Sequence, residues 1–228
     1  AVRQAGEKYK LSFKGFEVEA DAVILALPFT ILRTFTIEAP LEPGLRTFIK
    51  EAGYGMNAKV LAGFTKRLWR EQGYVGAFYG DESFQLAWDN SQLQPGTAGG
   101  FTFFTGGQKG IAAGKNSPEN QARQSLKSLE KIYPGMTVAL NGKFGRFHWP
   151  SHPFSLASYS CFKPGQYTQF AMNHLYTEEE GASSAVGVGK LLFAGEHLSS
   201  EFQGFMNGAA QTGRLAAQAL LQSSTKSA

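Results

Sequence analysis

The sequence has very little cysteine and no strong excess of either charge. Its 228 residues include one cysteine, Cys161, which excludes an internal disulfide and a metal site built from several thiolates. The net charge is only +4, and no cluster of Lys and Arg resembles a nucleic-acid-binding stripe. The four histidines show no metal-ligand spacing. We therefore expect no bound metal and no nucleic-acid partner.

Long hydrophobic runs are also missing. No apolar segment approaches the roughly 20 residues that a membrane-spanning helix needs, and no signal peptide opens the chain. These two features lead us to expect a cytoplasmic protein with no membrane span.

A Gly-x-Gly-x-x-Gly turn after a strand, the usual grip on a dinucleotide, is absent as well. The glycine clusters at 99–100 and 106–110 lack the strand-to-helix context that this motif requires. Glycine and phenylalanine are nevertheless abundant, with 27 and 19 residues. This composition indicates tight turns and an aromatic-rich interior.

Local patterns predict a mixture of strands and helices. The apolar run 22–27 is typical of a strand buried on both faces of a parallel sheet. A helix is predicted at 43–52, and a second at 118–133 with Ser117 as its N-cap. Residues 175–189 are predicted to form a loop or partly helical insertion. Alternating and apolar runs predict the remaining strands at 9–13, 16–20, 58–65, 74–79, 84–88, 101–105 and 138–147.

The segment 191–221 contains the most informative motif. A short apolar run ends at Gly195-Glu196-His197, and after a polar loop Gly204-Phe205-Met206-Asn207-Gly208 leads into an alanine-rich helical stretch. Such a strand–turn–helix aims backbone N–H groups and the positive end of the helix dipole at an anion or an electron-rich cofactor edge. This segment resembles the C-terminal FAD-binding signature of the flavin-containing amine oxidase family, which includes monoamine, polyamine and L-amino-acid oxidases.

The resemblance implies cofactor contacts for individual residues of this segment. Gly195 and Glu196 would approach the ribityl and pyrophosphate region, and Gly204 would permit close approach of the backbone. The backbone N–H of Met206 would donate to the flavin pyrimidine edge, where negative charge develops on reduction. The small residues of the following helix, Ala209, Gly213, Ala216 and Ala217, would form a face that packs closely against a sheet and the cofactor.

Lys59 lies in a stretch, 55–69, that resembles the family strand whose lysine hydrogen-bonds through a water to flavin N5. The resemblance implies that Lys59 assists reoxidation of the flavin by oxygen. The alternative is an ordinary surface lysine near the start of a strand.

The stretch 148–167 resembles the family segment that lines the substrate site. It implies that Trp149 packs near the flavin and that Tyr159 forms one wall of an aromatic substrate cage, with Phe205 as the second wall. Two facing rings exclude water and align an amine nitrogen or its α-carbon with N5. The alternative is that both aromatics belong to the core. In the monoamine oxidases a cysteine directly precedes the cage tyrosine, whereas Ser158 stands here and Cys161 is out of register, so we expect FAD to be held noncovalently.

The resemblance covers most of the chain but only about the second half of a typical family member. It implies an α+β fold in three parts: 1–52, a hairpin and a strand returning to the α/β FAD-binding domain; 53–146, a mixed-sheet substrate-binding domain; and 147–228, the cage segment and the C-terminal FAD-binding strand, loop and helix. We expect a fragment that works with an N-terminal FAD-binding half and oxidises an amine or amino acid. Two alternatives stay open, namely a flavin-dependent desaturase or isomerase of the same architecture, and a non-catalytic fragment that needs a partner chain.

Overall fold

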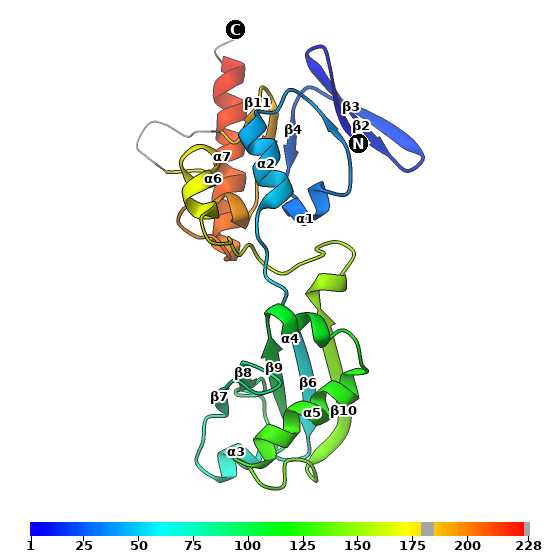
Figure 1. Cartoon of the computed structure of the whole chain (residues 1–228), viewed down its shortest axis with the longest axis vertical. Helices are drawn as coiled ribbons and strands as arrows, with labels where there is room; N and C mark the ends of the chain where they lie inside the picture. Colours follow the sequence, from blue (N-terminus) through cyan, green and yellow to red (C-terminus); the bar gives the residue numbers. More distant parts are fainter. Residues whose placement is uncertain (179–184, 226–228) are drawn as a thin grey trace. The chain divides into compact units, whose positions relative to one another are not determined.

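In a computed structural model, which describes residues 1–178 and 185–225, the chain folds into two compact units. Unit 1 combines residues 1–54 with those from Tyr159 onward, and unit 2 is the continuous segment Gly55–Ser158 (Figure 1). Each unit has its own buried hydrophobic cluster. Strands and helices are mixed in both units, so the predicted α+β fold class is confirmed.

Unit 1 contains two small sheets. The first has the strand order β3-β2-β1-β5 and the second has the order β11-β12-β4. The strands are β1 (Val2–Ala5), β2 (Lys8–Phe13), β3 (Phe16–Ala20), β4 (Val23–Leu25), β5 (Ile37–Glu38), β11 (Gly187–Val188) and β12 (Leu191–Phe193). The predicted N-terminal hairpin is confirmed by the antiparallel pairing of β2 with β3.

The second sheet joins the two ends of the chain, because β12 runs parallel to β4. The prediction of a parallel-sheet strand in 22–27 is therefore confirmed, although the strand is shorter. Burial on both faces is wrong for Ile24, which is 37% exposed because the described residues leave its face of β4 uncovered.

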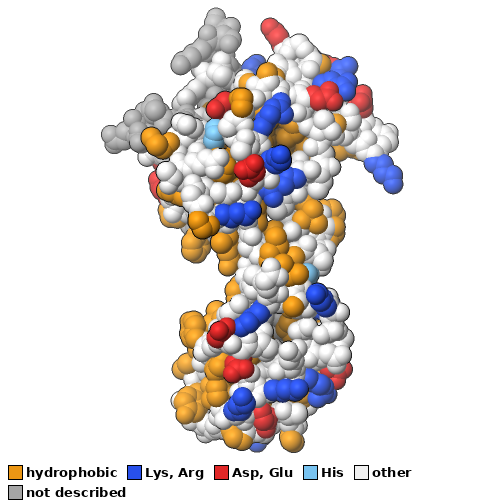
Figure 2. All heavy atoms as spheres, in the orientation of Figure 1, with side chains coloured by type: hydrophobic (Ala, Val, Ile, Leu, Met, Phe, Trp, Pro, Cys, Tyr) orange, Lys and Arg blue, Asp and Glu red, His pale blue; other side chains and the backbone are white. Residues whose placement is uncertain are grey.

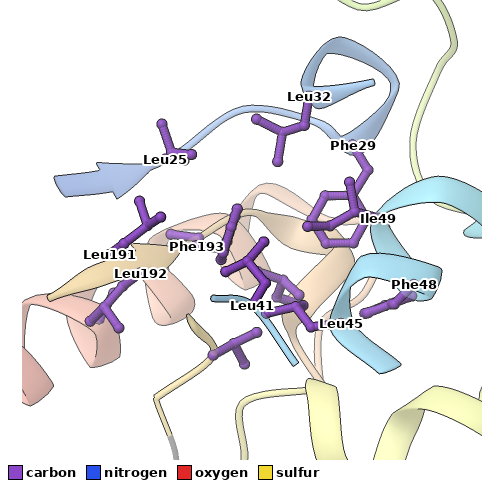
Figure 3. Packing of buried hydrophobic residues seen from close by; sticks show 14 of the residues in the cluster. Leu25, Phe29, Leu32, Leu41, Leu45, Phe48, Ile49, Leu191, Leu192 and Phe193 are labelled. Atoms are coloured by element: carbon purple, nitrogen blue, oxygen red, sulfur yellow. The ribbon is translucent and has the colours of Figure 1, made fainter. Parts of the chain in front are cut away.

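The helices of unit 1 pack around this parallel pair. They are α1 (Phe29–Leu32), α2 (Pro43–Glu51), α6 (Gln166–His174), the 3₁₀ turn η2 (Glu196–Leu198) and α7 (Met206–Thr225). Figure 3 shows side chains of β4, α1, α2 and β12 pointing toward one another in the core, with Phe29, Phe48 and Phe193 fully buried. Burial of a side chain of this size stabilises the fold by about 1.5–3 kcal/mol. The predicted helix 43–52 is confirmed as α2.

Helix α7 buries one face of its first three turns. The buried positions follow helical spacing, at i, i+3, i+4, i+7 and i+8 from the first: Gly208, Gln211, Thr212, Leu215 and Ala216. Of the four small residues expected to form one packed face, Ala216 is buried and Gly213 is half-buried, whereas Ala209 and Ala217 are exposed.

Unit 2 is one five-stranded antiparallel sheet covered on one face by a helix. The strand order is β10-β6-β9-β8-β7, and α5 packs against β6 and β10 (Figure 1). Its elements are β6 (Ala58–Phe64), α3 (Leu68–Glu71), β7 (Ala77–Tyr79), β8 (Leu86–Asp89), β9 (Gly99–Thr105), α4 (Gly107–Ala112), α5 (Pro118–Glu130), β10 (Leu140–His148) and η1 (Trp149–Ser151). Burial alternates strictly along β6, as the sequence predicted.

Helix α5 begins where its cap predicts. The Asn120 N–H donates to Ser117 Oγ at 3.1 Å, and Pro118 occupies the first turn. The helix ends at Glu130, three residues before the predicted end, and the Glu130 carboxylate accepts the N–H groups of Gly135 and Thr137 at 2.6 and 2.8 Å. The side chain thus ties the following turn to the helix end.

Other predicted elements shift or shorten. The strand predicted at 74–79 starts only at Ala77, because Gly73 and Gly76 adopt left-handed φ angles of 82° and 75° and form a turn. Of the loop predicted at 175–189, residues 179–184 lie outside the described part, and 187–188 form strand β11. The strand at 138–147 begins two residues later, at Leu140.

The division into units differs from the one expected at the second boundary. The sequence placed that boundary after residue 146, whereas the middle unit runs on to Ser158. The reason is a pair of hydrogen bonds back to the start of β6, from Trp149 N to Asn57 O at 3.3 Å and from Ser158 N to Gly55 O at 2.8 Å.

Exposed hydrophobic side chains gather over the β7 side of unit 2, as Figure 2 shows. Tyr79 of β7 and the preceding Tyr74 and Val75 are each more than half exposed. Within residues 1–178 and 185–225, none of the helices has the length and apolar character needed to cross a membrane.

Candidate active site

The turn that follows β12 requires glycine at its first position. Gly195 has φ of 152° and ψ of 164°, a region that only glycine occupies without strain, and a Cβ there would collide with the His197 ring. The Gly195 N–H donates to Thr212 Oγ1 at 2.9 Å, and that hydroxyl donates to Gly195 O at 3.1 Å. Two hydrogen bonds therefore fasten the turn to helix α7.

Glu196 is held by three hydrogen bonds from two other loops. Its Oε1 accepts from Ser160 N at 2.8 Å, and its Oε2 accepts from Ser160 Oγ at 2.7 Å and from Gly204 N at 2.6 Å. Short bonds to an ionised carboxylate are stronger than neutral ones. The contact with the ribityl region that the resemblance implies for Glu196 stays a prediction.

The two expected cage residues flank the partners of Glu196. Tyr159 precedes Ser160, and Phe205 follows Gly204. A Cβ added at Gly204 would lie 3.9 Å from Cδ2 of the Tyr159 ring, so the two loops are close together. Tyr159 is 46% exposed and Phe205 68% exposed, so neither is a core aromatic in this structure. Gly204 has φ of 84°, so its conformation, not lack of space, favours glycine.

Helix α7 presents its N-terminus next to Phe205. It starts at Met206, which is 89% exposed, and runs for 20 residues. The first N–H groups of a helix have no acceptor inside it, and they carry the positive end of the dipole. Gly204 and Phe205 thus lead directly into the start of α7 at Met206, while Gly195 is hydrogen-bonded to Thr212, six residues further along the helix.

Behind this turn, His197 is buried and neutral. Burial lowers the pKa of its imidazole to about 3, with a further contribution from the positive charge of Arg33. Its ring lies 4.3 Å from the Phe29 ring and 6.1 Å from that of Tyr54, centre to centre, and Nε2 has no partner among the described residues. Burial also raises the pKa of Tyr54, whose hydroxyl accepts the Phe29 N–H at 3.0 Å.

In unit 2, β6 places Lys59 on the face of the sheet that α5 does not cover. Residues facing α5 alternate with Lys59 along the strand, and Lys59 lies opposite Phe104 of β9 and Phe147 of β10. Its Nζ is 5.8 Å from the centre of the Trp88 ring, within the range of a cation–π interaction.

Trp149 lies at the same end of β6 as Lys59. Its ring packs 4.1 Å from the Phe147 ring, centre to centre, and the backbone N–H of Trp149 donates to Asn57 O at 3.3 Å. The Asn57 side chain accepts from Ser158 Oγ and donates to Thr105 O at 3.3 Å. The residue before Tyr159 is thus a hydrogen-bonded serine, and the expectation of noncovalent FAD stays a prediction.

The predicted site residues therefore form two groups. Unit 1 holds Tyr159 with the residues of the glycine turn and the start of α7, namely Gly195, Glu196, Gly204, Phe205 and Met206. Unit 2 holds Lys59 and Trp149. Sequence reasoning missed the partners Ser160, Thr212 and Asn57, because a hydrogen bond to a distant residue leaves no local pattern. The described residues contain no cluster of three His, Cys, Asp or Glu side chains that would suit a metal ion.

Comparison with known proteins identifies the family of this chain. The family model described as flavin containing amine oxidoreductase matches residues 1–221. The chain belongs to this family.

Among curated relatives, an L-amino acid dehydrogenase of Synechocystis sp. is 27% identical over 87% of this chain and 40% of its own length. Polyamine oxidase 2 of Arabidopsis thaliana is 28% identical over 87% of this chain and 38% of its length. A solved structure of putrescine oxidase bound to putrescine matches with a TM-score of 0.79 and 24% identity, covering 96% of this chain and 47% of that one. At this identity the structural likeness shows the fold alone. The chain thus spans less than half the length of these relatives.

Proposed function

We propose that this chain supplies the substrate-binding part and the flavin-ring end of an FAD-dependent oxidase of amines or L-amino acids. The observation that carries the proposal is the Gly195 turn fastened to α7, next to an exposed helix start with Tyr159 and Phe205 beside it. Membership of the flavin-containing amine oxidoreductase family supports it.

The residues present fit a flavin. The N–H groups at the start of α7 are donors suited to the pyrimidine edge, and Phe205 and Met206 beside them are 68% and 89% exposed. Gly195, Gly204, Phe205 and the Met206 N–H would hold the ring end of FAD noncovalently. When bound, the flavin supplies the acceptor for a hydride from the carbon next to the amine nitrogen and passes the electrons to oxygen, giving hydrogen peroxide and an imine that hydrolyses.

The chain's own residues would orient the substrate and hold a water molecule that assists reoxidation of the flavin. Tyr159 and Phe205 would bracket the amine and exclude water, since both rings are accessible at the loops that carry them. Trp149 would lie near the flavin, as the resemblance to the family implies. Lys59 would hold the water that assists reoxidation, because its ammonium lies on the uncovered face of the sheet.

Four arginines are candidates for gripping the carboxylate of an amino-acid substrate. Each is engaged within its own unit: Arg33 with Ile49 O and Ala52 O, Arg67 with Gln94 O, Arg70 with Asp89, and Arg146 with Ala113 O and Asn116 O. Each of these four would therefore have to give up a hydrogen bond within its own unit to bind a substrate carboxylate.

We further propose that the function requires a second segment that binds the ADP moiety. The sequence has no Gly-x-Gly-x-x-Gly turn, and the chain spans about 40% of its curated relatives. The relatives named above act, by their names, on an L-amino acid, a polyamine or putrescine. An amine or amino acid is accordingly the proposed substrate class.

The test uses a polypeptide that carries this chain together with a dinucleotide-binding segment, purified with FAD. Under anaerobic conditions a substrate amine or amino acid should bleach the flavin band near 450 nm, and air should restore it with formation of hydrogen peroxide. An artificial electron acceptor separates an oxidase from a dehydrogenase. Absence of bleaching across a panel of amines and amino acids would refute the proposal.

A further inference from the structure

The Glu196 carboxylate links two segments that are far apart in the sequence. One partner, Ser160, follows Tyr159, and the other, Gly204, precedes Phe205. Each proposed cage residue is therefore the covalent neighbour of a residue that donates to the same carboxylate. The carboxylate itself is anchored through Gly195, which two hydrogen bonds fasten to Thr212 of α7.

We propose that Glu196 is a positioning residue that fixes Tyr159 relative to Phe205 and thereby sets the width of the substrate cage. This inference rests on the proposed function, in which the two rings bracket the amine. Both rings are substantially exposed, so packing contributes little to their placement and the hydrogen-bonded backbone beside them decides it.

The bonding pattern explains why an ionised carboxylate suits this position. Ser160 N donates to one oxygen, while Ser160 Oγ and Gly204 N converge on the other. A carboxylate offers acceptors on both oxygens, whereas a glutamine amide replaces one of them by an NH₂ group that donates. The Glu196→Gln substitution thus places its NH₂ group against the N–H of Ser160 or of Gly204, so that at least one of the three hydrogen bonds is lost and the link between the loops is weakened.

The Ser160→Ala substitution distinguishes the positioning role of Glu196 from the cofactor contact that the resemblance implies for it. Removal of the Ser160 hydroxyl leaves the Glu196 carboxylate in place and weakens only the link between the loops. A contact of Glu196 with the ribityl group alone would leave Ser160→Ala without effect on the site.

The first experiment needs no cofactor. With p-fluorophenylalanine at position 205 of the whole chain, the ¹⁹F resonance reports the Phe205 side of the link while Ser160→Ala changes the Tyr159 side. We expect Ser160→Ala and Glu196→Gln to displace or broaden this resonance. The matched control is Ser12→Ala, which removes another hydroxyl–carboxylate bond of unit 1, from Ser12 Oγ to Glu17 at 2.8 Å, and should leave it unchanged. An unchanged resonance in both site variants, with thermal melting showing that they are folded, would overturn the proposal.

The second experiment uses the FAD-loaded polypeptide with its dinucleotide-binding segment. A misaligned cage should lower kcat/KM for the amine by about tenfold in Ser160→Ala and by roughly a hundredfold in Glu196→Gln, with the dissociation constant for FAD unchanged in Ser160→Ala. Weaker FAD binding in Glu196→Gln together with normal kinetics in Ser160→Ala would assign Glu196 to the cofactor and overturn the proposal. If no variant or parent oxidises an amine while the ¹⁹F resonance still responds, the proposed function fails and the link stands as a feature of the chain.

Discussion

In unit 2 a single strand places Lys59, whereas in unit 1 Glu196 is placed by hydrogen bonds to residues 36 and 8 positions away in the sequence. The first arrangement is local, because alternation along β6 fixes which side chains face away from α5. The second depends on the meeting of three loops, the turn after β12, the loop at Ser160 and the loop before α7. The contrast predicts that unit 1 is the more sensitive to single substitutions in its site.

The largest effect is expected for Gly195→Ala. The new Cβ would meet the buried His197 ring, and the backbone conformation at position 195 is strained for any other residue. The sum of both effects should lower the free energy of unfolding of unit 1 by about 3 kcal/mol or more. A fluorophore on Cys161, the only cysteine, reports unfolding of unit 1, while the three tryptophans, Trp69, Trp88 and Trp149, report unit 2.

The control for this change is Gly213→Ala in α7. A Cβ at position 213 has no heavy atom within 4 Å, so the substitution should stabilise the helix by about 0.5–1 kcal/mol. Equal stability of the two variants would contradict the account of the turn.

Lys59→Met is expected to have the next largest effect, on rate and not on stability. In the FAD-loaded polypeptide, reoxidation of the flavin by oxygen should slow by about a hundredfold, at the low end for loss of a group that assists proton transfer. Unfolding followed by tryptophan fluorescence should change by no more than about 0.5 kcal/mol, because Lys59 is not in the buried cluster. Lys66→Met, which removes an exposed lysine of the same unit, is the control and should leave reoxidation unchanged.

The sequence predicted locally determined features better than features that depend on contacts between distant residues. The alternation of β6, the cap of α5 and the hairpin of β2 and β3 were predicted because their signals lie within a few residues. Helix α6 was missed, since its N-cap residue is Gly165 in a left-handed conformation and no side chain caps the helix. The three hydrogen bonds of Glu196 were not predictable, because nothing near Ser160 or Gly204 in the sequence indicates that they share an acceptor.

Lowering the pH should reduce the stability of unit 1 more than that of unit 2, with a smaller effect than Gly195→Ala. The folded-state pKa of His197 is lowered to about 3 from 6.5, so below pH 6.5 the unfolded chain binds a proton that folded unit 1 does not. Unit 1 should therefore lose up to about 1.4 kcal/mol of stability per pH unit as the pH falls, or about 2 kcal/mol between pH 6.5 and 5.

Unit 2 should hold its stability further into the acid range. Burial alone would raise the pKa of the Asp89 carboxyl, but hydrogen bonds from Ser91, Trp69 and Arg70 outweigh it and hold this pKa below its usual value. The stability that the ionised carboxylate contributes is thus present above a pH of about 4 and is lost only below it. Denaturant unfolding at pH 7 and pH 5, read through the Cys161 fluorophore and the tryptophans, should show a drop for unit 1 alone. A parallel drop in both units would contradict the assignment to His197.

The smallest effect is expected for Ser117→Ala in unit 2. The Ser117 hydroxyl accepts one of the N–H groups that the first turn of α5 cannot satisfy internally, and its removal should lower the free energy of unfolding of unit 2 by about 1 kcal/mol. Ser117→Asp should recover this loss, since a carboxylate caps the helix and interacts favourably with its dipole. Because the cap hydrogen bond lies within unit 2, the Cys161 fluorophore should report no change in the unfolding of unit 1 in either variant. A changed unfolding free energy of unit 1 in the Ser117 variants would show that the two units unfold together. The units would then differ in how their site residues are positioned but not in stability.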